Sequence, residues 1–499
     1  NSVPNPDFAS ESGSFEIFTL DETDSVIDSK TDGLTLKFEP KPLKTFEINP
    51  ESSISGRETT WILEFEVEYA IPEGGSVIVS FPKWNEHLEG SENYLESFIQ
   101  SSPTCRPFSC TFENDQLTVS ISDETVGLVS LEVEPARNPP TTQGVSGFKL
   151  VTLAPNGSLE ESSDLTVTVK VDEPGSLVNA FFRFDRGNSK VNSQEIYKFS
   201  METSNPVPEG SYIEVTFPQE VALENYLTRV TGIFGFENNN PEFEVEGTSV
   251  RINYGFSRYK TGPSYLEFKF DSCKNPPTSE PTSSIKIAVY DKNNYIIDKV
   301  QNGLGVTSTP GTVENILVDP KDSQIEIETN YTISFYSNEP LTEGSAIFFT
   351  FPPQVQAKDR PESACAEVKG LGESATCEVL NNQLFVRKVF LTGTAQQEIE
   401  LVIDQVTNPM TTQTTEDFEV KLYSSDDFEY LISEGTGGRF AATPEKFKSV
   451  EIEPSSFVTG ELNRYYFTLE STNTIPREGK VVVVFPAEIR VLPDIAVCG

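Results

Sequence analysis

The sequence is poor in histidine, methionine and basic residues, and each shortage argues against a class of function. One His and 2 Met occur among 499 residues, and 37 basic residues face 77 acidic ones, giving a formal net charge of −40. Most acid–base, metal and nucleophile-activating chemistry uses histidine, so the shortage disfavours an enzyme. A negative field repels phosphate backbones and anionic membrane surfaces, which excludes nucleic acid as a partner.

Long hydrophobic runs and low-complexity tracts are also missing. No stretch approaches the about 18 apolar residues of a membrane span, so no direct membrane insertion is predicted for this segment. The 31 Gly and 34 Pro are scattered along the chain, which disfavours a collagen-like or disordered protein. The first ten residues are polar and carry no signal-peptide pattern, so we expect either a removed secretory signal or an interior piece of a longer chain.

The sequence does contain an internal repeat of about 134 residues. A turn and an alternating segment end in Phe-Pro four times, with the Phe at positions 81, 217, 351 and 485. An Asn-Pro pair recurs in the same register, at Asn5, Asn138, Asn275 and Asn408. Two independent markers with one period indicate tandem copies of one structural unit.

Each copy has the pattern of many short strands. The residues two and four positions before each Phe are β-branched or aromatic, and many of the residues between them are polar. This period predicts strands with one buried face. Seven or eight short strands per copy, separated by turn signals, are typical of a β-sandwich. We therefore expect an all-β fold of tandem immunoglobulin-like β-sandwich domains whose short linkers favour an elongated rod.

The phase of the markers sets the expected domain boundaries. Complete sandwich repeats are expected over 44–177, 178–312 and 313–446, with the C-terminal part of a repeat over 1–43 and the N-terminal part of one over 447–499. We expect the chain to continue at both ends; the alternative is that the tail of one chain completes the head of another. A Val-rich strand over 481–484 is expected to present an edge for pairing between chains.

Six cysteines indicate an oxidising compartment. Cys105 and Cys110, and likewise Cys365 and Cys377, lie close together after a Phe-Pro segment and are expected to form local disulfides. Cys498 occupies the first position of such a pair, so its partner is expected outside the segment. Cys273 has no such partner and is either a buried free thiol or the site of an intermolecular disulfide.

Further candidate sites involve glycans and calcium. The sequons at Asn156 and Asn330 fit N-glycosylation of a secreted chain. Acidic turns offer Asp21 and Asp24, and at an equivalent point Asp426 and Asp427, as calcium ligands, although solvated loops are the simpler interpretation. No other metal site is predicted.

Little in the sequence supports catalysis. Motifs for a serine hydrolase, a phosphate-binding loop or a histidine dyad are missing, and a carboxylate pair of glycosidase type is the remaining enzymatic alternative. The single His87 has no counterpart in the other repeats, and we expect it in an exposed loop. The nearby Trp84 is a candidate for binding a carbohydrate in an interstrand loop.

Three segments of the repeat together resemble the tandem repeats of long secreted or cell-surface proteins of ciliates and other protists. They are Ile-Pro-x-Gly-Gly-x-Val-Ile-Val-x-Phe-Pro at Ile71, the cysteine-containing loop, and Asn-Pro-x-Thr-Thr at Asn138. The resemblance implies an extracellular surface coat or a filament similar to the sheath of flagellar hairs, with no catalytic residues. We expect a non-enzymatic structural protein at the cell surface whose partners are other copies of itself, other surface proteins or glycans. The alternative is an adhesin or a carbohydrate-binding or ligand-binding ectodomain.

Overall fold

The computed structural model of the chain describes residues 2–163, 165–223, 227, 229–253, 255–301, 303–390 and 398–492. All regular elements in these residues are β-strands. Nothing helical in this part of the chain is long and apolar enough to cross a membrane. The chain divides into two compact units, residues 1–276 with 281–307, and residues 277–280 with 308–499.

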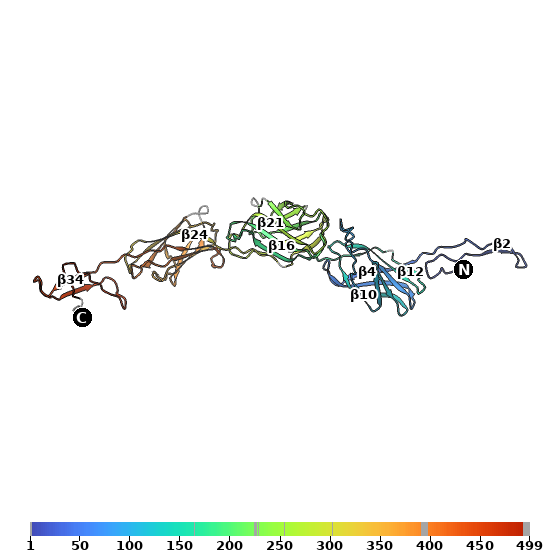
Figure 1. The fold of residues 1–499 in the computed structure, drawn as a ribbon, viewed down its shortest axis with the longest axis horizontal. Coiled ribbons are helices and arrows are strands. Elements are labelled where there is room, and N and C mark those ends of the chain that lie inside the picture. Colours follow the sequence, from blue (N-terminus) through green and yellow to red (C-terminus); the bar gives the residue numbers. More distant parts are fainter. Residues whose placement is uncertain are drawn as a thin grey trace. The chain divides into compact units, whose positions relative to one another are not determined.

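The first complete repeat is a sandwich of two antiparallel sheets, to which β4, β10 and β12 in Figure 1 belong. One sheet has the strand order β4-β5-β10-β7, and the other has the order β3-β12-β11-β6-β9-β8, with β13 paired to β11. A short parallel pair, β3 with β12, begins the repeat. The strands are β3 (Lys41–Pro42), β4 (Thr45–Pro50), β5 (Glu58–Ile71), β6 (Ser76–Ser80), β7 (Thr104–Arg106), β8 (Ser109–Glu113), β9 (Gln116–Ser120), β10 (Thr125–Arg137), β11 (Val145–Leu153), β12 (Leu159–Ser162) and β13 (Val167–Val169).

The second repeat has the same strand order, β15-β16-β21-β18 in one sheet and β14-β23-β22-β17-β20-β19 in the other. Figure 1 labels β16 and β21, which pair in the first of these sheets. The parallel pair β14–β23 corresponds to β3–β12. The strands are β14 (Gly175–Ser176), β15 (Val178–Phe184), β16 (Gln194–Glu202), β17 (Tyr212–Thr216), β18 (Arg229–Phe234), β19 (Glu242–Glu246), β20 (Ser249–Asn253), β21 (Tyr265–Lys274), β22 (Lys286–Tyr290) and β23 (Ile296–Lys299).

The third repeat follows the same plan, except that its first strand joins both sheets. The start of β24 pairs in parallel with β33, and the rest of β24 pairs with β25. The tandem β-sandwich fold expected from the sequence is therefore confirmed. The strands are β24 (Gly311–Pro320), β25 (Glu328–Ser337), β26 (Ser345–Thr350), β27 (Gln356–Ala357), β28 (Cys365–Lys369), β29 (Thr376–Leu380), β30 (Gln383–Val389), β31 (Glu398–Thr407), β32 (Phe418–Tyr423) and β33 (Leu431–Gly437).

Each repeat has its own hydrophobic core, built by the alternating side chains of its strands. In β6, Val77 and Val79 are buried while their neighbours are partly exposed, because successive side chains of a strand point to opposite faces. The three cores lie within residues 43–169, 177–306 and 313–432. The Phe of the Phe-Pro marker in each complete repeat, Phe81, Phe217 or Phe351, belongs to the core of that repeat, and Phe81 makes an edge-to-face contact with Phe148.

The two ends of the sequence form hairpins. β1 (Ile17–Leu20) pairs with β2 (Val26–Lys30), and β34 (Ser449–Pro454) pairs with β35 (Tyr465–Glu470). The prediction of a strand over 481–484 is wrong, because these residues form no strand and all four Val side chains are exposed. In the first repeat the corresponding strand, β6, is hydrogen-bonded to β9 on one side and to β11 on the other. The strands β34 and β35 do not correspond to β9 or β11, so residues 481–484 lack both of these neighbours.

Candidate functional site: the joints between repeats

The Asn of each Asn-Pro marker is buried in the three complete repeats and holds a turn against the core. Asn138 accepts a hydrogen bond from Trp61 Nε1 at 2.9 Å and donates through Nδ2 to the carbonyls of Ser52 and Ile54 at 2.7 and 2.8 Å. Tyr hydroxyls replace the indole in the other repeats. Asn275 accepts the hydroxyl of Tyr197 and donates to the carbonyls of Asn188 and Lys190. Asn408 accepts the hydroxyl of Tyr331 and donates to the carbonyls of Asp322 and Gln324.

The loop that follows this Asn joins the first repeat to the second within the first unit. The N–H of Thr142 donates to the carbonyl of Ile296, the first residue of β23, at 3.1 Å. In return, Thr142 Oγ1 accepts the N–H of Ile296 at 3.1 Å. Thr141 Oγ1 accepts the N–H of Gln143 at 3.0 Å, which shapes the turn. We call β12, β23 and β33 closing strands, and the N–H to carbonyl bond onto the first residue of a closing strand the clasp.

The clasp recurs at corresponding positions. Ala9, four residues after Asn5, donates to the carbonyl of Leu159 at 2.6 Å. In the second unit, Ser279 donates to the carbonyl of Leu431 at 2.8 Å and accepts the N–H of Leu431 on its Oγ at 2.9 Å. Ala9 has no hydroxyl, and it pairs with Leu159 through backbone atoms alone, as an isolated antiparallel bridge. Because the shared bond uses only backbone atoms, it does not depend on a particular side chain.

A glycine brings the same two repeats of the first unit into close contact beside the clasp. Gly56 has φ +69°, and a Cβ there would lie 1.7 Å from Asn205 Oδ1. Asn205 Nδ2 also donates to the carbonyl of Ser55 at 3.4 Å. Only glycine combines this backbone conformation with this approach.

Asp298 on β23 fixes Asn205 from the other side. Its carboxylate accepts the backbone N–H groups of Ser204 and Asn205, the hydroxyl of Ser204 and Nδ2 of Asn205, at 2.7–3.0 Å. Burial raises the pKa of Asp298 to about 6, and these hydrogen bonds oppose the increase. The corresponding residue Glu161 on β12 likewise accepts the N–H groups of Glu68 and Tyr69 at 3.0 Å.

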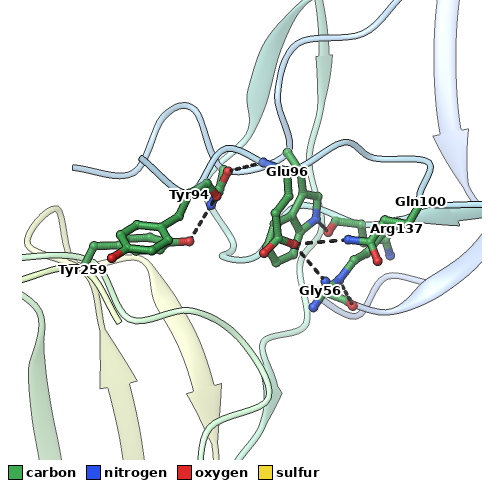
Figure 2. A network of polar contacts seen from close by, with 9 residues as sticks. Gly56, Tyr94, Glu96, Gln100, Arg137 and Tyr259 are labelled. Atoms are coloured by element: carbon green, nitrogen blue, oxygen red, sulfur yellow. Dashed lines mark hydrogen bonds and ion pairs between the residues drawn. The ribbon is translucent and has the colours of Figure 1, made fainter. Parts of the chain in front are cut away.

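An aromatic contact completes the joint of the first unit, as Figure 2 shows. Tyr94 stacks on Tyr259 of the second repeat, with ring centroids 5.7 Å apart. Asn85 donates to the Tyr259 hydroxyl. Burial raises the pKa of Tyr259 to about 12, so the hydroxyl stays protonated at neutral pH. Lys292 forms an ion pair with Glu89 in the same joint.

Arg137 supports this loop from the first repeat, and Figure 2 shows it between Glu96 and Gly56. Its guanidinium lies 4.0 Å from the centroid of the Trp84 ring, pairs with Glu96 at 3.5 Å and donates to the carbonyl of Gly56 at 3.1 Å. A planar cation stacked on an indole holds its position without full solvation. The loop that carries Tyr94 is therefore rigidly attached to its own repeat.

The expectations for Trp84 and His87 are corrected by burial. Trp84 is 1% exposed, and its Nε1 donates to the carbonyl of Asn138, so its indole is not available to a carbohydrate. His87 is not in an exposed position, because both ring nitrogens are buried and have no hydrogen-bond partner. Burial lowers the pKa of His87 to about 4.

Both predicted disulfides form, and each closes a short local loop while it connects the two sheets of its sandwich. Cys105 on β7 bonds to Cys110 on β8, and Cys365 on β28 bonds to Cys377 on β29. Cys273 is a free thiol with 0% exposure in the second core, and burial raises its pKa. A disulfide from Cys273 to another chain would therefore require this core to open. Cys498 lies outside the described residues.

The other candidate residues are exposed or partly exposed, all of them in turns except Asn330. The carboxylate of Asp21 accepts the N–H groups of Thr23 and Ser25, and Asp426 Oδ1 accepts the N–H of Lys388. Asp24 and Asp427 are exposed, and the described part of the chain contains no group of three or more His, Cys, Asp or Glu residues placed to hold a metal ion. Asn156 is exposed in the turn before β12, and Asn330 is partly exposed on β25.

The joint was not predicted from the sequence, although one signal for it was visible. A hydroxyl residue stands four positions after Asn138, Asn275 and Asn408, namely Thr142, Ser279 and Thr412. Its partners, Ile296 and Leu431, are about 150 residues away and are ordinary strand residues. No local pattern connects the two sides.

No family model matches the sequence, and a search of curated proteins found no match. Loosely similar solved structures include the N-terminal domain of a Streptococcus gordonii adhesin, with 9% identity, TM-score 0.20 and coverage of 81% of this chain and 94% of the other. The collagen adhesin of S. aureus has 10% identity, TM-score 0.16 and coverage of 54% and 94%. A type II cohesin dyad of Acetivibrio cellulolyticus has 11% identity, TM-score 0.17 and coverage of 52% and 97%. Similarities this low carry no information about function.

Proposed function

We propose that the chain is a non-enzymatic extracellular structural protein, a repeat rod of a cell-surface coat or filament that acts through repeat-to-repeat and chain-to-chain contacts. The observation that carries this proposal is the clasp, which recurs at Ala9, Thr142 and Ser279. A joint made by backbone atoms suits a protein that extends by adding copies. The resemblance to surface proteins of ciliates and other protists belongs to the same proposal.

Two further features support an extracellular location. The disulfides Cys105–Cys110 and Cys365–Cys377 persist in oxidising compartments and are rare in the cytosol. A strong negative charge keeps long chains soluble and apart until specific contacts form. Glycosylation at Asn156 and Asn330 fits this location and is part of the proposal, as is calcium bound by the acidic turns.

Electron microscopy of the purified native protein tests the structural function, with separate samples treated with a reductant and with a calcium chelator. We expect filaments or a regular coat. Separate particles at every protein concentration would contradict the proposal. Disassembly by the chelator alone would assign a role to Asp21, Asp24, Asp426 and Asp427.

A ligand-binding ectodomain is the second candidate, favoured by a cleft in the third repeat. The cleft encloses about 450 Å³ beside the disulfide Cys365–Cys377 and is lined in part by Glu378, Phe385 and Arg387. The guanidinium of Arg387 lies 4.7 Å from the ring centroid of Phe428 and 5.7 Å from that of Phe385, which leaves an aromatic and charged surface beside it.

A glycan array probed with the intact chain tests this second function. Binding that is lost in Phe385→Ala and kept in Phe348→Ala would support a site in the cleft, because Phe348 packs on Phe385 but does not line the cleft. An array without any bound glycan would count against carbohydrate as the ligand.

A further inference from the structure

We propose that the uncovered edge of β10, residues 125–131, binds an extended, positively charged peptide segment of another protein, which adds a strand to the sheet of the first repeat. The unpaired backbone of this edge, its exposed apolar side chains and the carboxylates on either side of it carry the inference. It goes beyond the structural function proposed above, because the edge would bind such a segment whether or not copies of the chain also assemble.

One side of β10 is only partly covered. β5 pairs with β10 from Thr125 to Arg137, but β7 pairs with it only from Glu132 to Glu134. In the described part of the chain, residues 125–131 pair with β5 and with no other segment. Alternate residues of a strand direct their N–H and C=O groups to the same side, so about half of these backbone groups point to the uncovered side. Such an edge is a template for a further strand.

The corresponding edge is covered in the other two repeats. In the third repeat β28 pairs with β31 as far as Glu400, and in the second repeat β18 pairs with β21 as far as Glu267. Counted back from the Asn of each Asn-Pro marker, Glu400 and Glu267 both correspond to Ser130. In the first repeat, the covering strand ends before it reaches Ser130.

The short cystine loop of the first repeat explains this difference. Cys105 pairs with Val133 on β10, and Cys365 pairs with the corresponding Ile403 on β31. The two cysteines of the disulfide are 5 residues apart in the first repeat and 12 in the third. Pro107 follows β7 and has no N–H to donate, and the chain then crosses to β8 in the other sheet. The open edge therefore results from the sequence of this repeat itself.

A neighbouring repeat does not cover an edge in this position. Within the first unit, the second repeat contacts the first through residues that include Asn205, Tyr259, Lys292 and Ile296. None of these lies on β21, the strand that corresponds to β10. The same arrangement at the other end of the first repeat would leave the edge of β10 uncovered.

The side chains of the edge favour an apolar strand beside them. Val126 and Leu128 are 59% and 71% exposed, whereas Val129 and Leu131 point into the core and are buried. A segment bound in the extended conformation would place alternate side chains beside these two rows. Contact with Val126 and Leu128 would remove apolar surface from water.

Carboxylates on both sides of the edge determine the charge of the partner. Asp123 and Glu124 precede the edge, and Glu132 and Glu134 follow it. No Lys or Arg stands among residues 107–136. The same edge of a second copy would bring a like set of carboxylates against this one. A segment in which Lys or Arg alternates with apolar residues complements it instead.

Fluorescence anisotropy of a labelled heptapeptide in which Lys and Val alternate tests the proposal, with the full chain as its binding partner. We expect saturable binding of this peptide, and no binding of the same peptide with Glu in place of Lys. A third peptide carries a methyl group on every backbone nitrogen, so it keeps its charges but has no N–H to donate. We expect its affinity to be about tenfold lower, from the loss of about two ladder hydrogen bonds.

Leu128→Lys places a like charge in the edge and removes an apolar contact, so we expect it to weaken binding of the Lys-Val peptide about tenfold. Leu317→Lys is the matched control, because Leu317 is 62% exposed on β24 of the third repeat and the substitution changes the net charge equally. Its affinity should stay unchanged. Hydrogen exchange should slow in residues 125–131 when the peptide is bound and stay constant in β31.

Failure of the Lys-Val peptide to bind would overturn the proposal. Equal loss of affinity in the two variants, or undiminished binding of the methylated peptide, would also overturn it, because attraction to the overall charge would then explain the binding. Self-association of the unmodified chain that Leu128→Lys abolishes would show that the edge binds a second copy, against the proposal. Melting curves of both variants should match that of the unmodified chain, because both side chains are exposed.

Discussion

At the scale of the residue, one buried amide organises each complete repeat. Asn138, Asn275 and Asn408 are each at most 2% exposed, and each accepts one hydrogen bond from an aromatic side chain and donates two to a turn. Only an amide both accepts and donates in this way without a charge. The sequence showed these residues as a marker of the repeat, but their role depends on partners up to 87 residues away.

Asn138→Ala tests this role. The substitution leaves Trp61 Nε1 and the carbonyls of Ser52 and Ile54 without their partner, so we expect the first repeat to lose about 3 kcal/mol of unfolding free energy. Denaturant unfolding followed by Trp fluorescence measures the loss, because both Trp residues lie in this repeat. The exposed Asn156→Ala serves as control and should change stability by less than about 1 kcal/mol. Equal effects of the two substitutions would contradict the assignment.

His87 and Asp298 are expected to respond to acid with opposite signs. Burial lowers the pKa of His87 to about 4, so between pH 6.5 and 4 the unfolded chain binds the proton first and folded stability falls. Burial raises the pKa of Asp298 to about 6, so between pH 6 and 3.8 the folded chain binds the proton first and stability rises. In the unmodified protein the two effects largely cancel.

Unfolding free energies measured from pH 7 to pH 4 separate the two groups. Relative to the unmodified chain, His87→Gln should gain stability and Asp298→Asn should lose it as the pH falls, each by up to about 1.4 kcal/mol per pH unit. The exposed Asn156→Ala, which removes no titratable group, is the control and should follow the unmodified profile. Parallel profiles for all three variants would show that neither buried group controls the response.

At the scale of the element, the repeats differ in how their two sheets are connected. Disulfides connect the sheets of the first and third repeats. In the second repeat, Phe236 follows β18 and packs against Phe256 and Phe268 with ring centroids 5.4 and 5.8 Å apart. This aromatic cluster lies between β18 and β19, which correspond to the two strands that the disulfide connects in each of the other repeats.

Reduction of the disulfides is therefore expected to destabilise the first and third repeats and to leave the second repeat unchanged. The unfolding free energy should fall by about 2–3 kcal/mol in the first and third repeats, from the loop-closure entropy of separations of 5 and 12 residues, and stay constant in the second. Hydrogen exchange of peptides from the three cores, with and without reductant, measures each repeat separately. Equal loss of protection in all three would rule out this division.

The strands of the complete repeats could be predicted because their side chains alternate, as Val77 and Val79 do in β6. The same pattern failed over 481–484, because a strand also requires neighbours that bond to it, and β34 and β35 do not correspond to the neighbours of β6. Trp84 and His87 were misjudged for a related reason. Their loop lies against Asn138 and the second repeat, and no pattern near residue 84 indicates such distant contacts.

At the scale of the whole molecule, the joint of the first unit should couple the unfolding of its two repeats. Gly56→Ala places a Cβ against Asn205 without changing a core residue, so we expect the joint to loosen and the calorimetric transitions of the two repeats to separate. Gly157→Ala is the matched control, since Gly157 also has positive φ (+82°) and nothing lies within 4 Å of its added Cβ. A single shared transition in Gly56→Ala would show that the two repeats are not coupled through this contact.

The Asn-Pro pairs also affect how the protein ages. Asparagine deamidates when the nitrogen of the next residue attacks its side-chain carbonyl, and the nitrogen of a proline has no hydrogen with which to complete that reaction. Asn138, Asn275 and Asn408 each precede proline, so the amides that hold these turns against the cores cannot deamidate by this route. Asn156 precedes Gly157, and the same reaction is fastest before glycine. Asn156 is exposed in a turn, so its deamidation would disturb the fold little. The turn that each of these three residues holds would therefore keep its hydrogen bonds as the protein ages.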